Sequence, residues 1–328
     1  MKDADKKIIL TGMRPTGILH IGNYFGALLP LVKLQKDADE FFIMIADLHA
    51  LTTLKHSQDI GKNSLVLATI YLATGIDPQK STIFAQSHIS EHAELANILG
   101  TITPLSMLEL NPVYKEIKEE TSKLIKNNLG LLAYPVLQAA DILLYKTTGV
   151  PVGKDQEPHI EIAREIARRF NSRFGEIFVE PKTILQKESK IYSLQDATKK
   201  MSKSHGEKTY ISLLDSPEKI REKIKIAVTD SGKEIIYDPK KKPAISNLLT
   251  IYNLFSGKPA KEFAGGYAEF KKELAEVIIE GLAPLQKKYK ELEKNPDYVK
   301  EVLAQGNKKA KKIASQTMEA VKTKIGFL

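Results

Sequence analysis

The sequence predicts an α/β protein: a doubly wound parallel sheet that carries an insertion, followed by an all-α C-terminal domain. Short apolar runs at 7–12, 41–46 and 82–85 alternate with segments of helical periodicity, and strands that alternate with helices form parallel sheets. Beyond residue 205 the periodicity is helical and no convincing strand run follows. The helical segments there are 213–228, 244–256, 262–293 and 297–325.

The first elements carry their own start and stop signals. The run 7–12 is apolar and ends in glycine, which predicts a buried strand. Apolar residues at helical spacing predict a helix over 21–36, with a kink or break at Pro30. A further helix over 58–75 ends at its terminal glycine.

The alternation breaks at 103–132, where prolines and a charged run predict an insertion between two halves of the sheet. A helix over 135–145, a strand end at 150–153 and a helix over 156–171 follow. Ligands of such sheets bind beyond the carboxyl ends of the strands, so we expect the site there.

Composition narrows the class of protein. The 328 residues include no cysteine, which excludes disulfides, thiolate catalysis and zinc bound by cysteine. With no signal peptide or transmembrane run apparent, we expect a cytoplasmic chain with no membrane partner. The net charge is +9, and most of it lies beyond residue 205, as expected for a region that meets a polyanion. A solvated lysine-rich surface would carry the same charge.

Two short segments indicate phosphate chemistry. The first, Thr11 to Asn23, reads as a strand end, a glycine-rich turn and a helix start, where His20, Asn23 and free N–H groups can donate to phosphate oxygens. The second is Lys200-Met201-Ser202-Lys203-Ser204, whose two lysines can neutralise a leaving pyrophosphate. Each segment alone also fits an ordinary exposed loop.

One helix predicts a pocket for an amino-acid side chain. Tyr134, Gln138 and Asp141 recur at i, i+4 and i+7, on one face of an otherwise apolar helix. Polar groups are costly to bury without a partner, so we expect Asp141 to accept from a ring donor. Tyr134 and Gln138 would face an α-amino group. A polar network that caps the insertion is the alternative.

Two more positions follow predicted strands. Asp155, in Gly153-Lys154-Asp155-Gln156, can accept from ribose hydroxyls or cap the next helix, and Gln156 can reach an α-amino group. His49 follows the second strand and also lies at the ligand end of the sheet, although a structural histidine fits there too. The sequence has no metal-ligand spacing of His, Asp and Glu and no obvious Ser-His-Asp triad.

Together, the two phosphate segments resemble the HIGH and KMSKS signatures of class I aminoacyl-tRNA synthetases. Along nearly its whole length the chain resembles bacterial tryptophanyl-tRNA synthetases. The residues that carry this resemblance are Gly12–Leu28, Asp47–Ala50, Tyr134–Tyr145, Val150–Asn171, Lys200–Ser204 and Ile245–Leu249.

The resemblance implies a Rossmann-like catalytic domain over 1–205, with the insertion at about 103–132. It implies a helical anticodon-binding domain over 206–306 and a C-terminal helix, 307–328, that returns to the catalytic domain. It also implies that Mg²⁺ accompanies ATP as substrate, that L-tryptophan and tRNA(Trp) are the other substrates, and that the chain forms a homodimer.

Carried over by motif, the resemblance assigns residues to the site. The catalytic group comprises Lys200, Lys203 and His20. The ATP site comprises Arg14, Gly22, Asn23, Gly153, Asp155, Ile191, Met201, Ser202 and Ser204. The amino-acid pocket comprises Tyr134, Gln138, Asp141, Val150, Val152, Gln156 and His49, with Asp141 taking the indole N–H.

Two positions depart from the common family pattern. Many members carry glutamine where this chain has Arg14 and methionine where it has Gln138. Arg14 can hold the substrate carboxylate by charge. Gln138 creates a spacing also found in tyrosyl-tRNA synthetases, so Asp141 fits an indole N–H or a phenol O–H. Asn23, where tyrosyl enzymes usually carry a second histidine, and the stretch from Val150 to His159 favour tryptophan.

The sequence therefore predicts an enzyme that activates L-tryptophan with ATP and transfers it to tRNA(Trp). Activation of tyrosine is the alternative among enzymes. A non-catalytic paralogue that binds tRNA or a regulatory partner is the alternative of another class, and the intact His20, Lys200 and Lys203 argue against it.

Overall fold

The structure is a computed structural model that describes residues 6–52, 59–110, 114, 128–186, 190–232, 234–258 and 262–327. The chain divides into two compact units. The first comprises Met1–Gly17, Val32–Gln186 and Asn295–Leu328, and the second comprises Ile18–Leu31 and Lys187–Lys294.

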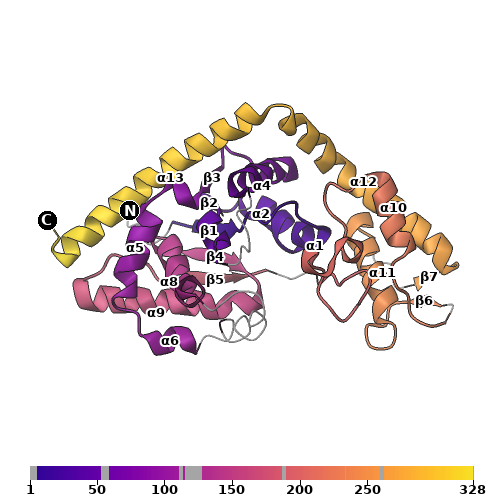
Figure 1. The fold of residues 1–328 in the computed structure, drawn as a ribbon, viewed down its shortest axis with the longest axis horizontal. Helices are drawn as coiled ribbons and strands as arrows, with labels where there is room; N and C mark the ends of the chain where they lie inside the picture. Colours follow the sequence, from indigo (N-terminus) through magenta and orange to yellow (C-terminus); the bar gives the residue numbers. More distant parts are fainter. Residues whose placement is uncertain are drawn as a thin grey trace. The chain divides into compact units, whose positions relative to one another are not determined.

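A five-stranded, all-parallel sheet forms the centre of the first unit (Figure 1), in the order β3-β2-β1-β4-β5. The strands are β1 (Ile8–Met13), β2 (Glu40–Ile45), β3 (Ser81–Ala85), β4 (Gly149–Val152) and β5 (Lys182–Leu185). The doubly wound sheet is thus confirmed, and its chain order reverses between β1 and β4, where such folds bind ligands. The sequence did not predict β5, a four-residue edge strand with no fully buried residue.

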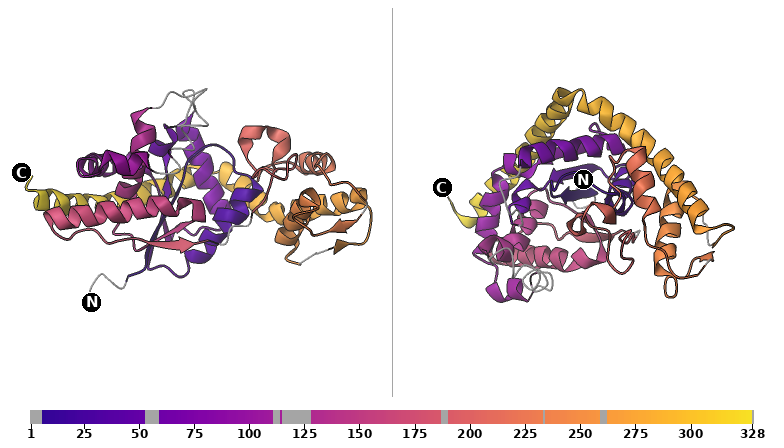
Figure 2. Two further views of the ribbon diagram at one scale, coloured as in Figure 1. Left: turned by 90° about the horizontal axis from the view of Figure 1, so that it is seen from below. Right: turned by 45° about the vertical axis from the view of Figure 1, so that its right-hand side comes forward.

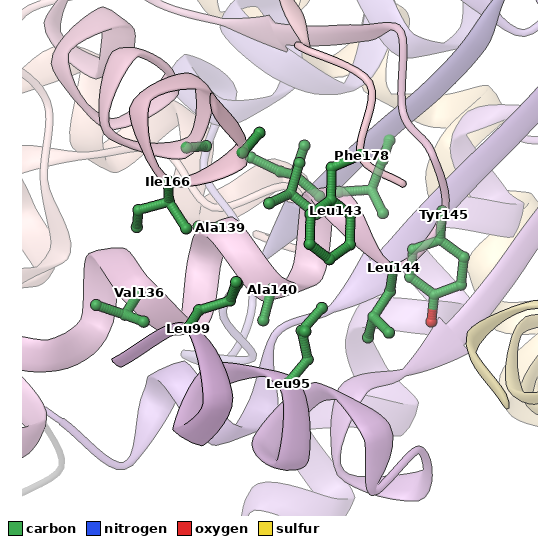
Figure 3. Close-up of a cluster of buried hydrophobic side chains, with 14 of the residues drawn as sticks. Leu95, Leu99, Val136, Ala139, Ala140, Leu143, Leu144, Tyr145, Ile166 and Phe178 are labelled. Atoms are coloured by element: carbon green, nitrogen blue, oxygen red, sulfur yellow. The ribbon is translucent and has the colours of Figure 1, made fainter. Parts of the chain in front are cut away.

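Helices flank this sheet. They are α3 (Asp47–Ala50), α4 (Ile60–Thr74), α5 (Glu91–Gly100), α6 (Leu105–Glu109), α8 (Leu129–Leu143), α9 (Glu157–Phe174) and α13 (Pro296–Ile325). Figure 3 shows the core between three of them, with Leu95 and Leu99 of α5 and Ile166 of α9 gathered around α8. Burying each large aliphatic side chain contributes about 1.5–3 kcal/mol, so this cluster fixes the position of α8.

Helix α8 begins at Leu129, six residues before the predicted start at Pro135. The Asn128 side chain caps it by accepting from the Leu131 N–H at 2.9 Å. Pro135 lies inside the helix, where it costs about 3 kcal/mol, but burial of the surrounding apolar face offsets that cost. Of the predicted insertion, α6 and the start of α8 belong to the described chain, whereas 111–113 and 115–127 lie outside it.

Helix α13 covers the outer edge of β3, the edge that pairs with no other strand of the sheet, and also packs on α4 and α5 (Figure 1). A Cβ at Gly306 would lie 1.8 Å from the carbonyl oxygen of Ile83, so only glycine allows this approach. The Asn307 side chain then accepts from the Ala85 N–H at 2.8 Å and satisfies part of the strand edge. The helix spans Pro296–Ile325, within one residue of the predicted start of the helix over 297–325.

The second unit is helical, which agrees with the predicted α-rich C-terminal region. Its helices are α1 (Ile21–Asn23), α10 (Pro217–Lys225), α11 (Pro243–Ser256) and α12 (Tyr267–Glu293). It also contains a short antiparallel pair beside α11 (Figure 2), formed by β6 (Ile235–Ile236) and β7 (Glu262–Phe263). Strands of two residues are too short to show alternation, so the sequence did not predict them.

The helix predicted over 21–36, with a kink or break at Pro30, is a continuous helical run from Ile21 to Leu34 whose winding changes before Pro30. Between α1 and α2 (Leu29–Leu34) the chain forms a π-helical turn, Tyr24–Leu28. Pro30 has no N–H to donate to the Gly26 carbonyl, and its ring crowds that carbonyl, so the helix widens just before it.

The boundary between units differs from the predicted division at residue 205. The segment around His20 pairs with Ile211–Leu213: the Ile21 N–H donates to the Ile211 oxygen at 3.0 Å, and the Leu213 N–H to the Leu19 oxygen at 2.9 Å. Backbone pairing therefore joins a segment near the N-terminus to the chain beyond 205. The sequence has no local signal for a pairing across nearly 200 residues.

Candidate active site

His20 begins helix α1 and forms a reciprocal cap with Asn23. The Asn23 N–H donates to Nδ1 of His20 at 3.3 Å, and the His20 N–H donates to Oδ1 of Asn23 at 3.1 Å. Because Nδ1 accepts, a neutral imidazole carries its proton on Nε2. Nε2–H of His20 and the side-chain amide N–H₂ of Asn23 are thus the donors that remain at this helix start.

His20 is neutral over the physiological pH range. Burial, followed by the positive charges of Lys203 and Lys200, lowers the pKa of its imidazole from 6.5 to about 4. The glycine at position 22 permits this arrangement, because a Cβ there would lie 2.9 Å from Nδ1 and Cε1 of His20. His20 therefore offers a hydrogen bond without a charge.

Lys203 belongs to the same unit and reaches the segment that carries His20. Its Nζ donates to the carbonyl oxygen of Ile18 at 3.1 Å, and partial burial lowers the pKa of this ammonium. Ser202 shapes the loop, since its hydroxyl lies 2.8 Å from that of Ser204 and accepts from the Ser204 N–H. Lys200 is exposed at the start of the loop. The structure thus brings the two predicted phosphate segments together.

The backbone at Ile191 and Met201 also comes together. The Met201 N–H donates to the Ile191 oxygen at 3.0 Å, and Tyr192 pairs with Lys200 across the same turn. The buried amide of Asn247 on α11 holds the N–H and the carbonyl of Tyr192, at 2.9 and 3.1 Å. Asn247 is a positioning residue that residue types alone did not single out, although it lies in a segment that carried the resemblance.

In the first unit, Asp141 lies at the centre of a buried polar network. Its Oδ2 is 2.8 Å from Nε2 of His49, and its Oδ1 is 2.7 Å from Nε2 of Gln86 and 2.6 Å from Nδ1 of His92. Nε2 of His92 in turn lies 2.9 Å from the Tyr145 hydroxyl. Asp141 and His49, both predicted for the amino-acid pocket, are therefore in direct contact.

The network keeps Asp141 ionised. Burial by itself would raise the pKa of this carboxyl, but hydrogen bonds from His49 and His92 outweigh burial and lower the pKa from 3.8 to about 2. An ionised carboxylate only accepts hydrogen bonds. Asp141 is thus an obligate acceptor, as a ligand with a ring N–H or O–H requires.

The sequence missed three members of this network. Gln86 follows β3, so its place at a strand end was an available signal. His92 on α5 and Tyr145 just after α8 had no such signal, because only packing of the two helices brings them together. Tyr134, on the predicted pocket face, has its hydroxyl 2.5 Å from Nε2 of the buried His159.

The remaining predicted residues lie in the first unit near the ends of β1 and β4. Arg14 follows β1 and is exposed, Val150 and Val152 are in β4, and Gln156 precedes α9. The cap position of α9 is Gln156, and the side chain of Asp155, for which the sequence left ribose binding and helix capping open, lies outside what the structure describes. Gly153 begins the helical turn before α9, and Gln138 is half-buried on α8.

Within the described ranges, no group of three or more His, Cys, Asp and Glu side chains is arranged to hold a metal ion. Over those same ranges, no helix is both long and apolar enough to cross a membrane.

The first unit has a parallel sheet whose chain order reverses between β1 and β4, together with a buried acceptor. The second unit has a capped helix start and two lysines. These features are typical of α/β enzymes that use nucleotides. Residues 2–283 match the model of the family described as tRNA synthetases class I (W and Y). The chain belongs to this family, and the resemblance to bacterial tryptophanyl-tRNA synthetases is confirmed.

The relatives cover nearly the whole chain. It is 46% identical to a tryptophan–tRNA ligase of Caldanaerobacter subterraneus subsp. tengcongensis, over 98% of this chain and 99% of the relative. The tryptophanyl-tRNA synthetase of Campylobacter jejuni, solved as a complex with ADP and tryptophan, is 38% identical, with a TM-score of 0.83 over 97% and 99% of the two chains. That of Mycoplasma pneumoniae is 31% identical, with a TM-score of 0.85 over 98% of each chain.

Proposed function

We propose that the chain is a tryptophan–tRNA ligase. The ionised carboxylate of L-tryptophan attacks the α-phosphorus of ATP, the bond to the β-phosphate oxygen breaks, and tryptophanyl-adenylate and pyrophosphate form. A terminal ribose hydroxyl of tRNA(Trp) then attacks the activated carbonyl and releases AMP. The contact of Lys203 with the segment that begins at Ile18 carries the proposal, because it brings together the groups that activation by ATP requires.

The second unit would bind the phosphates. Nε2–H of His20 and the amide of Asn23 donate to phosphate oxygens, and Gly22 lets them approach the backbone. The ammonium groups of Lys200 and Lys203 neutralise charge that develops on pyrophosphate, an effect worth several kcal/mol in a dry site. Ser202 and Ser204 hold the loop in shape, and the backbone at Ile191 and Met201 borders the adenine.

Mg²⁺ would enter as the complex with ATP, which makes it part of the substrate. This ion prefers phosphate oxygens and water and usually needs few protein carboxylates. The donors around His20 are neutral or cationic and suit phosphates that already carry a cation.

The first unit would bind the amino acid. Asp141 accepts from the indole N–H, and His49 holds its Oδ2. Val150 and Val152 form an apolar wall, and Tyr134, Gln138 and Gln156 face the α-amino group. Arg14 lies beyond β1, where its charge attracts the substrate carboxylate or a phosphate, and Gly153 and Asp155 border the ribose.

We further propose a cytoplasmic homodimer in which 206–306 binds the anticodon and the C-terminal helix belongs to the catalytic domain. Family membership supports the tRNA partner. The exposed lysines at 240 and 241 support a polyanion surface in this region. Light scattering at several protein concentrations tests the dimer. The mass of a monomer at every concentration would contradict it.

Amino-acid-dependent exchange of pyrophosphate into ATP tests the reaction. Tryptophan should support exchange and tyrosine should not. Exchange with tyrosine alone would favour the tyrosine alternative, which rests on the spacing of Tyr134, Gln138 and Asp141. Retained tRNA binding with no exchange would favour a non-catalytic protein. The chain contains no tryptophan, so bound ligand is the only indole and its fluorescence reports binding directly.

A further inference from the structure

Among the residues that the structure describes, three donors contact Asp141, and one acceptor position is left. A carboxylate has about four lone-pair sites, two on each oxygen. Gln86 and His92 occupy both sites on Oδ1, whereas His49 occupies one site on Oδ2. The side chain of His49 is 12% exposed, while Gln86 and His92 are 0% exposed, so Oδ2 lies on the side of the network nearest to solvent. A ligand donor must therefore reach Oδ2.

The two donors to Oδ1 are themselves held in one orientation. Oε1 of Gln86 accepts from the His49 N–H at 3.4 Å, which leaves its amide N–H₂ toward Asp141. His92 donates from Nδ1 to an ionised carboxylate, so a neutral imidazole at this position accepts at Nε2 from the Tyr145 hydroxyl. Burial, with the charges of Asp141 and Glu91, raises the pKa of Tyr145, so its hydroxyl keeps the proton that it donates.

Packing fixes both ends of this relay. The ring of Tyr145 stacks on Phe42 at a centroid distance of 4.8 Å and lies at the edge of the apolar cluster in Figure 3. Helix α13 holds the neighbouring backbone, because the Thr317 hydroxyl donates to the Leu144 oxygen at 2.7 Å. On the other side, Ser315 of α13 donates to Glu91, the residue before His92. These contacts hold the relay in place from both α13 and the apolar cluster.

We propose that His92, backed by Tyr145, is a specificity-determining positioning residue that fills Oδ1 of Asp141 and leaves Oδ2 as the only acceptor for the substrate ring. The inference rests on the proposed role of Asp141 toward tryptophan. A substrate ring without a hydrogen-bond donor would leave one acceptor site of Oδ2 without a partner. A ring with an N–H donates to that site. His92 thus acts through Asp141 and need not touch the substrate.

The test compares tryptophan with 3-benzothienylalanine, in which sulfur replaces the indole N–H in a ring of nearly the same shape. The readout is the ratio of kcat/KM for the two amino acids in pyrophosphate exchange. A hydrogen bond to a charged group predicts a wild-type preference for tryptophan of about 10- to 150-fold. Tyr145→Phe removes the donor to His92 without touching Asp141, and should lower the ratio about three- to tenfold through KM for the amino acid. KM for ATP should stay constant.

Tyr71→Phe is the matched control. Tyr71 is equally buried in the same unit, and its hydroxyl has no hydrogen-bond partner among the described residues. His92→Phe should lower the ratio by about tenfold or more, and His92→Gln, which keeps a donor, should restore part of it.

The outcomes distinguish the proposed contact of Asp141 with the substrate ring from the proposed role of His92 and Tyr145. A wild-type enzyme that uses both amino acids equally well would refute the Asp141 contact itself. A wild-type preference that is unchanged in Tyr145→Phe would overturn the relay alone, whether or not His92→Phe folds. Equal losses of activity with both amino acids would assign His92 and Tyr145 to stability only.

Discussion

The substitution Gly22→Ala tests how closely catalysis depends on the position of the His20 ring. A Cβ at position 22 would lie 2.9 Å from Nδ1 and Cε1 of His20. Carbon atoms in good contact are about 3.5–4.0 Å apart, so the ring must retreat by about 0.6 Å or more. The hydrogen bond from the Asn23 N–H to Nδ1 is already 3.3 Å long and would be lost.

The expected losses of stability and of exchange rate follow from the lost hydrogen bond and from the movement of the His20 ring. Loss of the cap costs about 1 kcal/mol of stability. Removing one donor to a developing oxyanion costs about 10²–10³ in rate, so displacing it should cost about 10- to 100-fold, or about 1.4–2.7 kcal/mol. KM for tryptophan should change little, because the amino-acid residues belong to the other unit.

The assay is pyrophosphate exchange at saturating tryptophan and ATP, with thermal unfolding measured in parallel. Gly26→Ala is the matched control, since a Cβ there meets nothing within 4 Å in the same helical segment. If Gly22→Ala and Gly26→Ala exchange pyrophosphate at the same rate, the contact between His20 and the phosphates is not what limits activation.

Four further outcomes are expected. Lys203→Ala should lower the exchange rate by orders of magnitude with little change in tryptophan affinity by fluorescence; equal losses in both would count against a role in the transition state. The pKa of His20 is about 4 in the folded chain and 6.5 in the unfolded chain, so the unfolded chain binds more protons between these pH values. As the pH falls through that window, His20 should therefore lower the free energy of unfolding of the wild type by about 3 kcal/mol. Urea unfolding of His20→Asn should lack this slope, and parallel slopes would contradict the shift. Gly306→Ala should destabilise the chain by at least about 2 kcal/mol, although alanine has the better helix propensity. Gly100→Ala is the control, because a Cβ there meets open space, and it should be neutral or stabilising. Similar unfolding midpoints for the two variants would refute the close approach of α13 to β3. Reversing the charges of Lys240 and Lys241 should leave exchange intact but weaken tRNA charging and its salt dependence, and unchanged salt dependence would remove these lysines from the tRNA surface.

Local patterns determined much of the first unit. Short apolar runs predicted β1, β2 and β3. In the second unit, the missing N–H of Pro30 predicted the disturbance of the helix over 21–36. The start of α8 was wrong, because burial of that helix outweighs the cost of Pro135, and burial is not visible in a short window of sequence. The strand β5 was missed because it is short and has no fully buried residue, and β6 and β7 were missed because two residues show no alternation.

The sequence by itself predicted which groups take part in the chemistry: the donors at His20 and Asn23, the lysines of the 200–204 loop, and the acceptor Asp141. Residue types and spacing are enough for such a prediction, because the chemistry of phosphate and of ring donors restricts the side chains that can serve. Only the tertiary structure decided what surrounds them. The tautomer and charge of His20 depend on Asn23 and Lys203, and the ionisation of Asp141 depends on His49 and His92. These partners lie from 3 to 183 positions away from His20 or Asp141 along the chain. Their hydrogen bonds and pKa values depend on being buried next to one another, and no local sequence pattern encodes that burial.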